Sequence, residues 1–135
     1  MAGYSGTPLR RKLGIKDGHV VFVDRVPEGV DLGDLDGARV VRRLPRRADV
    51  TLVFALTNAE LGRRLPVLFD RTALDGLVWV CWPKKAAQRA LGLASDLDDG
   101  VVRALGLDLG FVDVKVAAID EVWSGLKFVR RLRDR

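Results

Sequence analysis

The sequence predicts a single α/β domain in which helices cover both faces of a mostly parallel β-sheet. Two observations lead to this prediction. Apolar runs of strand length alternate along the chain with segments whose apolar residues recur at helical spacing. The run at 76–82 is apolar on both of its faces, which is typical of a central strand with helices above and below it. The length of 135 residues fits one domain, residues 1–135, and leaves no room for a second.

Six segments have the length and composition of β-strands. They are 19–24, 37–44, 49–56, 76–82, 111–119 and 125–132. Only a few residues separate the last two, so we expect them to form an antiparallel hairpin. In the fifth segment, the alternation predicts that Asp113 and Lys115 point to one face of the sheet and the neighbouring valines to the other.

Two longer helices are expected in the gaps between the strands. Thr57 and Glu60 have the spacing of a capping box, which predicts a helix start directly after the third strand. Pro66 lies inside that helix and should kink or divide it, because proline cannot donate the helical hydrogen bond. A second helix start is predicted at 95–98, and Gly106 is expected to end that helix.

The remaining segments predict a short helix and several connections. Residues 8–14 predict a short helix within an N-terminal segment, 1–17, that packs on the sheet. The segment 27–37 is too rich in glycine and aspartate for a long helix. Residues 86–96 predict an ordinary surface connection, with a mobile flap as the alternative. The charged residues 132–135 predict a frayed tail.

These elements together predict a Rossmann-like three-layer sandwich with a mostly parallel sheet and a C-terminal antiparallel hairpin. A closing hairpin of this kind resembles the end of the S-adenosylmethionine-dependent methyltransferase fold, so we expect a methyltransferase-like topology. Architecture of this kind does not by itself carry function.

Composition narrows the classes of partner. The net charge of +5 would suit nucleic acid, but the basic residues are scattered in pairs with acids between them, so nucleic-acid binding is not the expected function. No apolar run is long enough to span a bilayer, so no membrane partner is expected. The start of the chain lacks the apolar stretch of a secretory signal, and Cys81 is the sole cysteine. Both observations predict a cytoplasmic protein; its oligomeric state is left open.

Four segments, 3–18, 82–85, 95–107 and 110–131, resemble the bacterial Domain of Unknown Function family 3052. The last segment carries the most specific motifs, "VDVKV" and "WSGLKF". The family has no assigned reaction, so the resemblance implies a stand-alone cytoplasmic protein and no particular chemistry. Many members carry a cysteine where this chain has Ala117, so the resemblance implies that thiol chemistry is absent there.

The loop after the first strand decides whether a nucleotide is expected. In open parallel sheets, ligands bind beyond the carboxyl ends of the strands. A phosphate cradle at that point needs several glycines, because the ligand approaches the backbone more closely than a Cβ permits. After Asp24 this chain has Pro27, Glu28 and a single Gly29, so we do not expect a dinucleotide. Asp24 itself either contacts a ligand or only forms the turn.

Other polar residues at the predicted strand ends are candidates for ligand contact. The full set of expected ligand-binding residues is Asp24, Asn58, Lys84, Lys85, Tyr4, Ser5 and Thr7. The two lysines could meet a carboxylate or phosphate as point charges, or could lie in a solvated loop. The hydroxyl-bearing N-terminal residues could fold over the sheet end, or could be disordered. Trp123 either anchors a protein partner or packs across the hairpin.

Residues for catalysis are scarce. His19 is the only histidine, and it begins a strand at the end opposite to the expected ligand edge. Cys81 lies within an apolar strand, where a thiol is ordinarily inert. The sequence therefore predicts no catalytic residue, no metal site and no cofactor.

The favoured function is a non-catalytic binding or regulatory module that recognises a small anionic ligand or a protein partner at the strand-end edge. The alternative is a divergent S-adenosylmethionine-dependent methyltransferase-like enzyme. A second alternative is weak binding of nucleic acid.

Overall fold

The structure is a computed structural model and describes residues 8–135. Its strands are β1 (Val20–Asp24), β2 (Arg39–Val41), β3 (Ala48–Phe54), β4 (Thr72–Pro83), β5 (Phe111–Ala118) and β6 (Trp123–Arg130). Its helices are α1 (Leu9–Leu13), α2 (Asn58–Asp70), α3 (Lys85–Leu91) and α4 (Asp99–Asp108), with a 3₁₀ turn at Leu132–Asp134. None of these helices is long and apolar enough to cross a bilayer.

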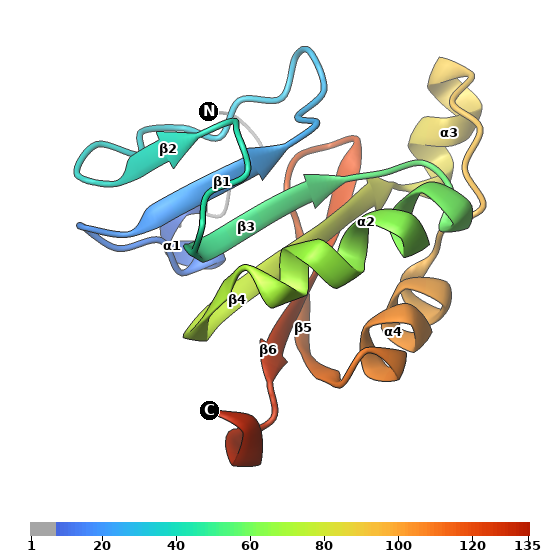
Figure 1. Cartoon of the computed structure of the whole chain (residues 1–135). Coiled ribbons are helices and arrows are strands. Elements are labelled where there is room, and N and C mark those ends of the chain that lie inside the picture. The colour runs from blue at the N-terminus through green and yellow to red at the C-terminus, as the bar shows by residue number, and fades with distance from the viewer. Residues whose placement is uncertain (1–7) are drawn as a thin grey trace.

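All six strands belong to one sheet, in the order β2-β1-β3-β4-β6-β5 (Figure 1). The first four strands pair in parallel, and β6 is antiparallel to both of its neighbours. The predicted mostly parallel sheet with a C-terminal antiparallel hairpin is therefore confirmed. The chain adds β2 on one side of β1 and β3 on the other, so the topological switch point lies between β1 and β3.

Each face of the sheet carries its own apolar core. Strand β4 contributes Val78, Val80 and Trp82 to one core, and Trp79 and Cys81 to the other, so its two apolar faces are confirmed. Helices α2 and α4 cover the first face. The second face is covered mainly by the short helix α1 and the irregular segment 26–38. The third layer is therefore thin, because the first crossover contains no helix.

A β-bulge changes the direction of the side chains in β5. The register shifts between Asp113 and Lys115: the first pairs with Phe128, and the second with Lys127. The extra residue places the two charged side chains on opposite faces, so the prediction that they share a face is wrong. Lys115 then lies across from Lys127, and burial, followed by the charge of Lys115, lowers the pKa of Lys127.

The helices differ from the sequence-based expectations in three places. Helix α2 continues through Pro66 without division. Helix α4 continues through Gly106, whose lack of a side chain makes room for the ring of Phe128, so the prediction that this glycine ends the helix is wrong. Residues 85–91 form α3, although a connection was expected; Lys84, at its N-cap, makes no side-chain capping bond that would have marked the start.

Candidate functional site

Strands β1, β3 and β4 are parallel, so their carboxyl ends reach the same edge of the sheet (Figure 1). Asp24 ends β1, the loop after Phe54 leads to α2, and Pro83 leads to α3. The switch-point rule places the ligands of open α/β sheets at this edge. The edge therefore gathers most of the described ligand-binding candidates from the sequence.

Asp24 is held by an arginine from α2. Its two carboxylate oxygens accept hydrogen bonds from Arg64 Nε and a terminal nitrogen, at 2.8 and 3.0 Å. The Asp24 side chain is only 8% exposed, so its charge requires a partner of this kind. The hydrogen bond to Asp24 raises the pKa of Arg64. Both side chains are committed to each other, and Asp24 has little surface left to offer a ligand.

A second ion pair lies beside the first. Arg25 has a left-handed backbone (φ 60°), uncommon for a residue with a side chain, and it donates to Glu60 at 2.6 Å. Glu60 also accepts from the backbone nitrogen of Leu56, while Thr57 accepts from the backbone nitrogen of Glu60. The predicted helix cap is confirmed, and the ion pair between Arg25 and Glu60 links the start of α2 to the end of β1.

Asn58 and Lys84 make structural contacts. The backbone nitrogen of Asn58 donates to Asp96 at 2.7 Å, while the residue itself remains exposed. The ammonium of Lys84 donates to the carbonyl oxygen of Asp120 at 2.8 Å, in the turn between β5 and β6. The Lys84 backbone nitrogen donates to Val122 in the same turn. Lys84 therefore ties α3 to the hairpin, and its charge is partly shielded from the edge.

The other predicted site residues have different surroundings. Lys85 is exposed at the first position of α3 and could meet an anion. Trp123 is buried, 7% exposed, with its ring edge-on to Phe54 at 5.3 Å between centroids. It cannot act as an exposed anchor for a partner, because its ring packs in the second apolar core. The predictions for Tyr4, Ser5 and Thr7 lie outside the described residues.

The loop after β1 encloses a hollow of about 530 Å³. Its walls come from residues 26–33 and Leu35 of the loop, from Val23 in β1 and Val40 in β2, and from Arg42 just after β2. Gly29 and Gly33 both have left-handed backbones, with φ of 90° and 78°, and a Cβ added to either would meet no atom within 4 Å. The loop that was expected to be too bulky for a nucleotide thus folds over β1 and β2 and leaves open space beside them.

The hollow combines apolar walls with both signs of charge. Val26, Leu32 and Val40 provide apolar surface, and the charged lining residues are the acids Glu28 and Asp31 and the base Arg42. Apolar walls with a few polar groups are typical of small-molecule sites. Carboxylates can accept from hydroxyl or ammonium groups, and a guanidinium can meet a carboxylate. The residues present therefore offer apolar contact and both signs of charge to a small ligand.

Residues suited to proton transfer are few at this edge. Burial raises the pKa of the Cys81 thiol, so its reactive thiolate form is disfavoured. His19 lies before β1 at the opposite end, where its Nδ1 accepts from the backbone nitrogen of Lys16. Within residues 8–135, no group of three histidine, cysteine or acidic side chains is arranged to hold a metal ion.

Sequence reasoning missed Arg64 and the hollow. Arg64 lies 40 residues after Asp24, and its helical position gave no signal that it would reach the end of β1. The glycine and aspartate content of 27–37 signalled an irregular crossover. The fact that this crossover folds back over β1 and β2 depends on contacts that no local pattern encodes.

The sequence matches no family model and no curated protein. The resemblance to Domain of Unknown Function family 3052 therefore stays a prediction. Comparison with solved structures is more informative, because 103 chains match the fold.

Several of these structures are methyltransferases with bound ligands. Magnesium protoporphyrin IX methyltransferase from Synechocystis PCC 6803, with bound SAH, aligns with a TM-score of 0.61 and 12% identity over 91% of this chain and 78% of its own. The 1,6-didemethyltoxoflavin-N1-methyltransferase of Burkholderia thailandensis, with bound 1,6-didemethyltoxoflavin and S-adenosylhomocysteine, aligns with a TM-score of 0.59 and 15% identity. That alignment covers 90% of this chain and 74% of the other.

The O-methyltransferase of neocarzinostatin biosynthesis, in complex with S-adenosylmethionine and 2-hydroxy-5-methyl naphthoic acid, aligns with a TM-score of 0.58 and 16% identity. That alignment covers 84% of this chain and 49% of the other. At identities this low, the alignments show the fold alone. They confirm the predicted methyltransferase-like topology.

Proposed function

We propose that this chain is a divergent methyltransferase-like protein that binds S-adenosylmethionine, or a close adenosyl relative, in the hollow beside β1. The observation that carries the proposal is the position of this hollow beside β1 and β2 near their carboxyl ends, next to the switch point between β1 and β3. Solved proteins of the same fold hold S-adenosylmethionine or its product S-adenosylhomocysteine. This replaces the small anionic ligand as the favoured occupant of the edge.

The chemistry of the lining supports an adenosyl ligand. Val26 and Val40 offer apolar surface to the adenine ring, and the Glu28 carboxylate can accept from ribose hydroxyls or from the ammonium of the methionine end. Arg42 can meet the methionine carboxylate. When bound, S-adenosylmethionine supplies an activated methyl group on sulfur. The chain's own residues would orient it and shield it from water.

A binding test uses a steric block and a matched control. Thermal melting and calorimetric titration with S-adenosylmethionine and S-adenosylhomocysteine should show dose-dependent stabilisation, about 2.7 kcal/mol at a hundredfold excess over Kd. Val40→Trp should fill the hollow and lower the affinity at least about tenfold, or about 1.4 kcal/mol. Val40 is 41% exposed on one edge strand of the sheet, so the bulky ring should not unfold the protein.

Val114→Trp is the control, because Val114 is 52% exposed on the other edge strand. It should bind as the wild type does. If neither adenosyl ligand stabilises the wild type, or if both tryptophan variants bind equally well, the proposal fails.

A second candidate is recognition of the adenosyl ligand without turnover. Acid and base groups at the edge are already engaged: Asp24 with Arg64, and Glu60 with Arg25. Mass spectrometry of reactions with phenol and amine acceptors separates the two candidates. Release of S-adenosylhomocysteine above the background of the Val40→Trp variant supports transfer, and tight binding without release supports recognition.

A further inference from the structure

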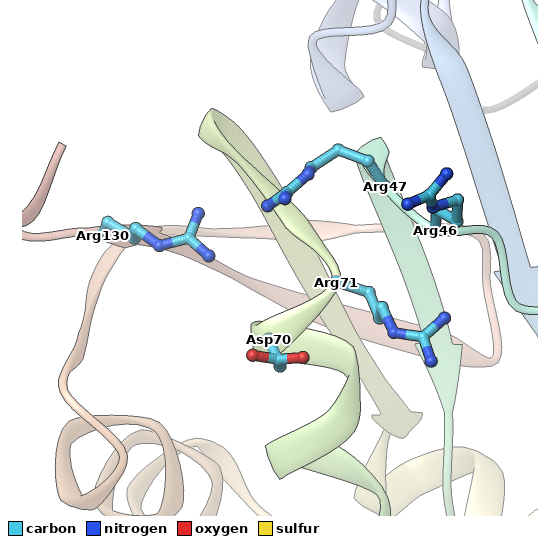
Figure 2. Close-up of a pocket in the computed structure, with 5 residues that line it drawn as sticks. All are labelled: Arg46, Arg47, Asp70, Arg71 and Arg130. Carbon is cyan, nitrogen blue, oxygen red and sulfur yellow. The ribbon is translucent and has the colours of Figure 1, made fainter.

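A second cavity lies at the amino edge of the sheet, opposite to the proposed adenosyl site. It has a volume of about 500 Å³, and its lining residues are Arg46, Arg47, Asp70, Arg71 and Arg130. They come from three separate segments: the approach to β3, the junction of α2 with β4, and the end of β6. Figure 2 shows their side chains around the junction of α2 with β4. Scattered arginine pairs in the sequence are thus brought together by the fold.

Backbone carbonyl groups hold three of the guanidinium groups. Arg130 donates to Ala73 at 2.6 Å and to Phe69 at 3.0 Å. Arg71 donates to the carbonyl oxygen of Pro45 at 3.0 Å, and Arg47 makes a longer bond of 3.5 Å to Thr72. These bonds fix the directions of the side chains without cancelling their charges.

The positive charge of the cavity is not neutralised within the described chain. Among residues 8–135, none of the four arginines forms a salt bridge. Asp70 is the one carboxylate in the lining, so four guanidinium groups and one carboxylate leave a net charge of +3. Such a concentration of one sign in a concave surface focuses the electrostatic field and attracts ions of the opposite sign.

Two of the arginines face each other. Arg47 and Arg130 extend toward one another across the α2–β4 junction (Figure 2). Burial, and then the charge of Arg47, lowers the pKa of Arg130, whereas Asp70 and Asp134 act in the opposite direction. Arg130 also lies over the ring of Phe111, 5.1 Å from its centroid, which anchors the guanidinium at this depth. Two like charges held in place are stabilised by an anion between them.

We propose that this cavity binds a compact oligophosphate, such as pyrophosphate or the di- or triphosphate end of a small molecule. Guanidinium groups form paired hydrogen bonds with phosphate oxygens and keep their charge at all physiological pH values. Four of them, spread over an open cavity, can engage more oxygens than one phosphate presents. Linked phosphates bring several negative charges to the net +3 of the lining.

The shape of the site favours a small ligand over a nucleic acid. The arginines line one hollow and come from three segments instead of following a stripe along one face. The site shares no residue with the hollow at the carboxyl edge, so the inference stands independently of the proposed adenosyl ligand.

The test measures binding of inorganic pyrophosphate and tripolyphosphate by calorimetric titration at constant ionic strength. We expect saturable one-to-one binding, with orthophosphate at least about tenfold weaker. Arg46→Ala with Arg47→Ala should weaken pyrophosphate binding by about tenfold or more. Both side chains are exposed, so the double variant should keep the wild-type melting temperature. Arg11→Ala with Arg89→Ala removes the same charge from exposed positions on α1 and α3 and should bind as the wild type does.

A second variant should act in the opposite direction. Asp70→Asn removes the one negative charge of the lining and should strengthen pyrophosphate binding severalfold. Asp70 is exposed at the last position of α2, where the helix dipole disfavours a carboxylate, so this change should not weaken the fold. Glu121→Gln is the matched control, because it removes one exposed acid from the opposite edge of the sheet and should leave the affinity unchanged.

Three results would overturn the proposal. The first is an equal loss of affinity in the Arg46/Arg47 and Arg11/Arg89 double variants, because the effect would then be one of net charge alone. The second is orthophosphate binding as tightly as pyrophosphate. The third is duplex DNA or RNA binding more tightly than tripolyphosphate with a steep dependence on salt, which would assign the surface to nucleic acid.

Discussion

Asp24 and Arg64 show how a single residue pair fixes the end of a strand. The Asp24 side chain is 8% exposed and that of Arg64 is 28% exposed, which makes this the most buried ion pair in the described part of the chain. Removing one partner of such a pair leaves a charge away from water, which costs far more than the pair contributes. The neighbouring pair of Arg25 and Glu60 is 51% and 33% exposed, so water can replace its partner.

Arg64→Met should therefore lower the free energy of unfolding by about 3 kcal/mol, because Asp24 loses both of its hydrogen bonds. Urea denaturation at pH 7 measures this. Asp24→Asn combined with Arg64→Met should recover part of the loss, and Arg25→Met should cost less than about 1 kcal/mol. Equal effects of Arg64→Met and Arg25→Met would mean that water reaches Asp24 as freely as it reaches Glu60.

A second residue pair predicts a dependence on pH. The hydrogen bond from Arg103, 2.9 Å long, lowers the pKa of Asp113. A carboxyl group whose pKa is lower in the folded state stabilises the fold above its unfolded pKa, and this contribution disappears as the pH falls through the folded value. Asp113→Asn should thus be less stable than the wild type at pH 7, and the difference should shrink and vanish as the pH falls through the lowered pKa of Asp113.

Melting temperatures across that range measure the effect. A difference that persisted at the lowest pH would show that Asp113 acts by packing and not by its charge. The pair is partly exposed, so the change in melting temperature should be small.

The position of helix α4 depends on Gly106, a residue whose role local sequence rules predict wrongly. Gly106 was expected to end the helix, because glycine commonly follows a helix C-terminus. The helix instead passes through it, and an added Cβ would overlap the ring of Phe128, which is fully buried. The glycine permits close approach of α4 to β6. In the sequence, this role has the same appearance as a stop signal.

Gly106→Ala should destabilise the protein by about 1–3 kcal/mol through overpacking, although alanine favours helices by about 1 kcal/mol over glycine. Gly62→Ala is the matched control in α2, because a Cβ there would meet no atom within 4 Å. It should raise stability by up to about 1 kcal/mol. Urea denaturation measures the free energy of unfolding of both variants. A change in the same direction in both would contradict this account.

At the scale of the whole molecule, the two candidate sites lie at opposite edges of the sheet. The hollow beside β1 lies at the carboxyl ends of the parallel strands, and the arginine cavity lies where β3 and β4 begin. The proposed adenosyl and oligophosphate ligands therefore do not compete for the same residues. The tests with Val40→Trp and with the Arg46/Arg47 double variant should each affect one ligand and spare the other.

Much of the fold follows from local pattern, but the sites do not. The strand-length apolar runs, the two-sided pattern of β4 and the capping signal at Thr57 identify the sheet and α2 because they reflect burial and backbone hydrogen bonding within a few residues. Lys84 shows the limit of such reasoning. Its position after a central strand indicated a ligand contact, yet its ammonium binds the carbonyl of Asp120, 36 residues away.

The sequence by itself determined the α/β class, the mostly parallel character of the sheet and the closing hairpin, since these depend on periodicity and on the lengths of connections. Only the tertiary structure decided which charges meet: Asp24 with Arg64, and Arg47 with Arg130. The same holds for the hollow formed when residues 26–35 fold back over β1 and β2. The physical reason is that side-chain pairing and cavities depend on distances between segments far apart in the chain, which no local pattern of residues encodes.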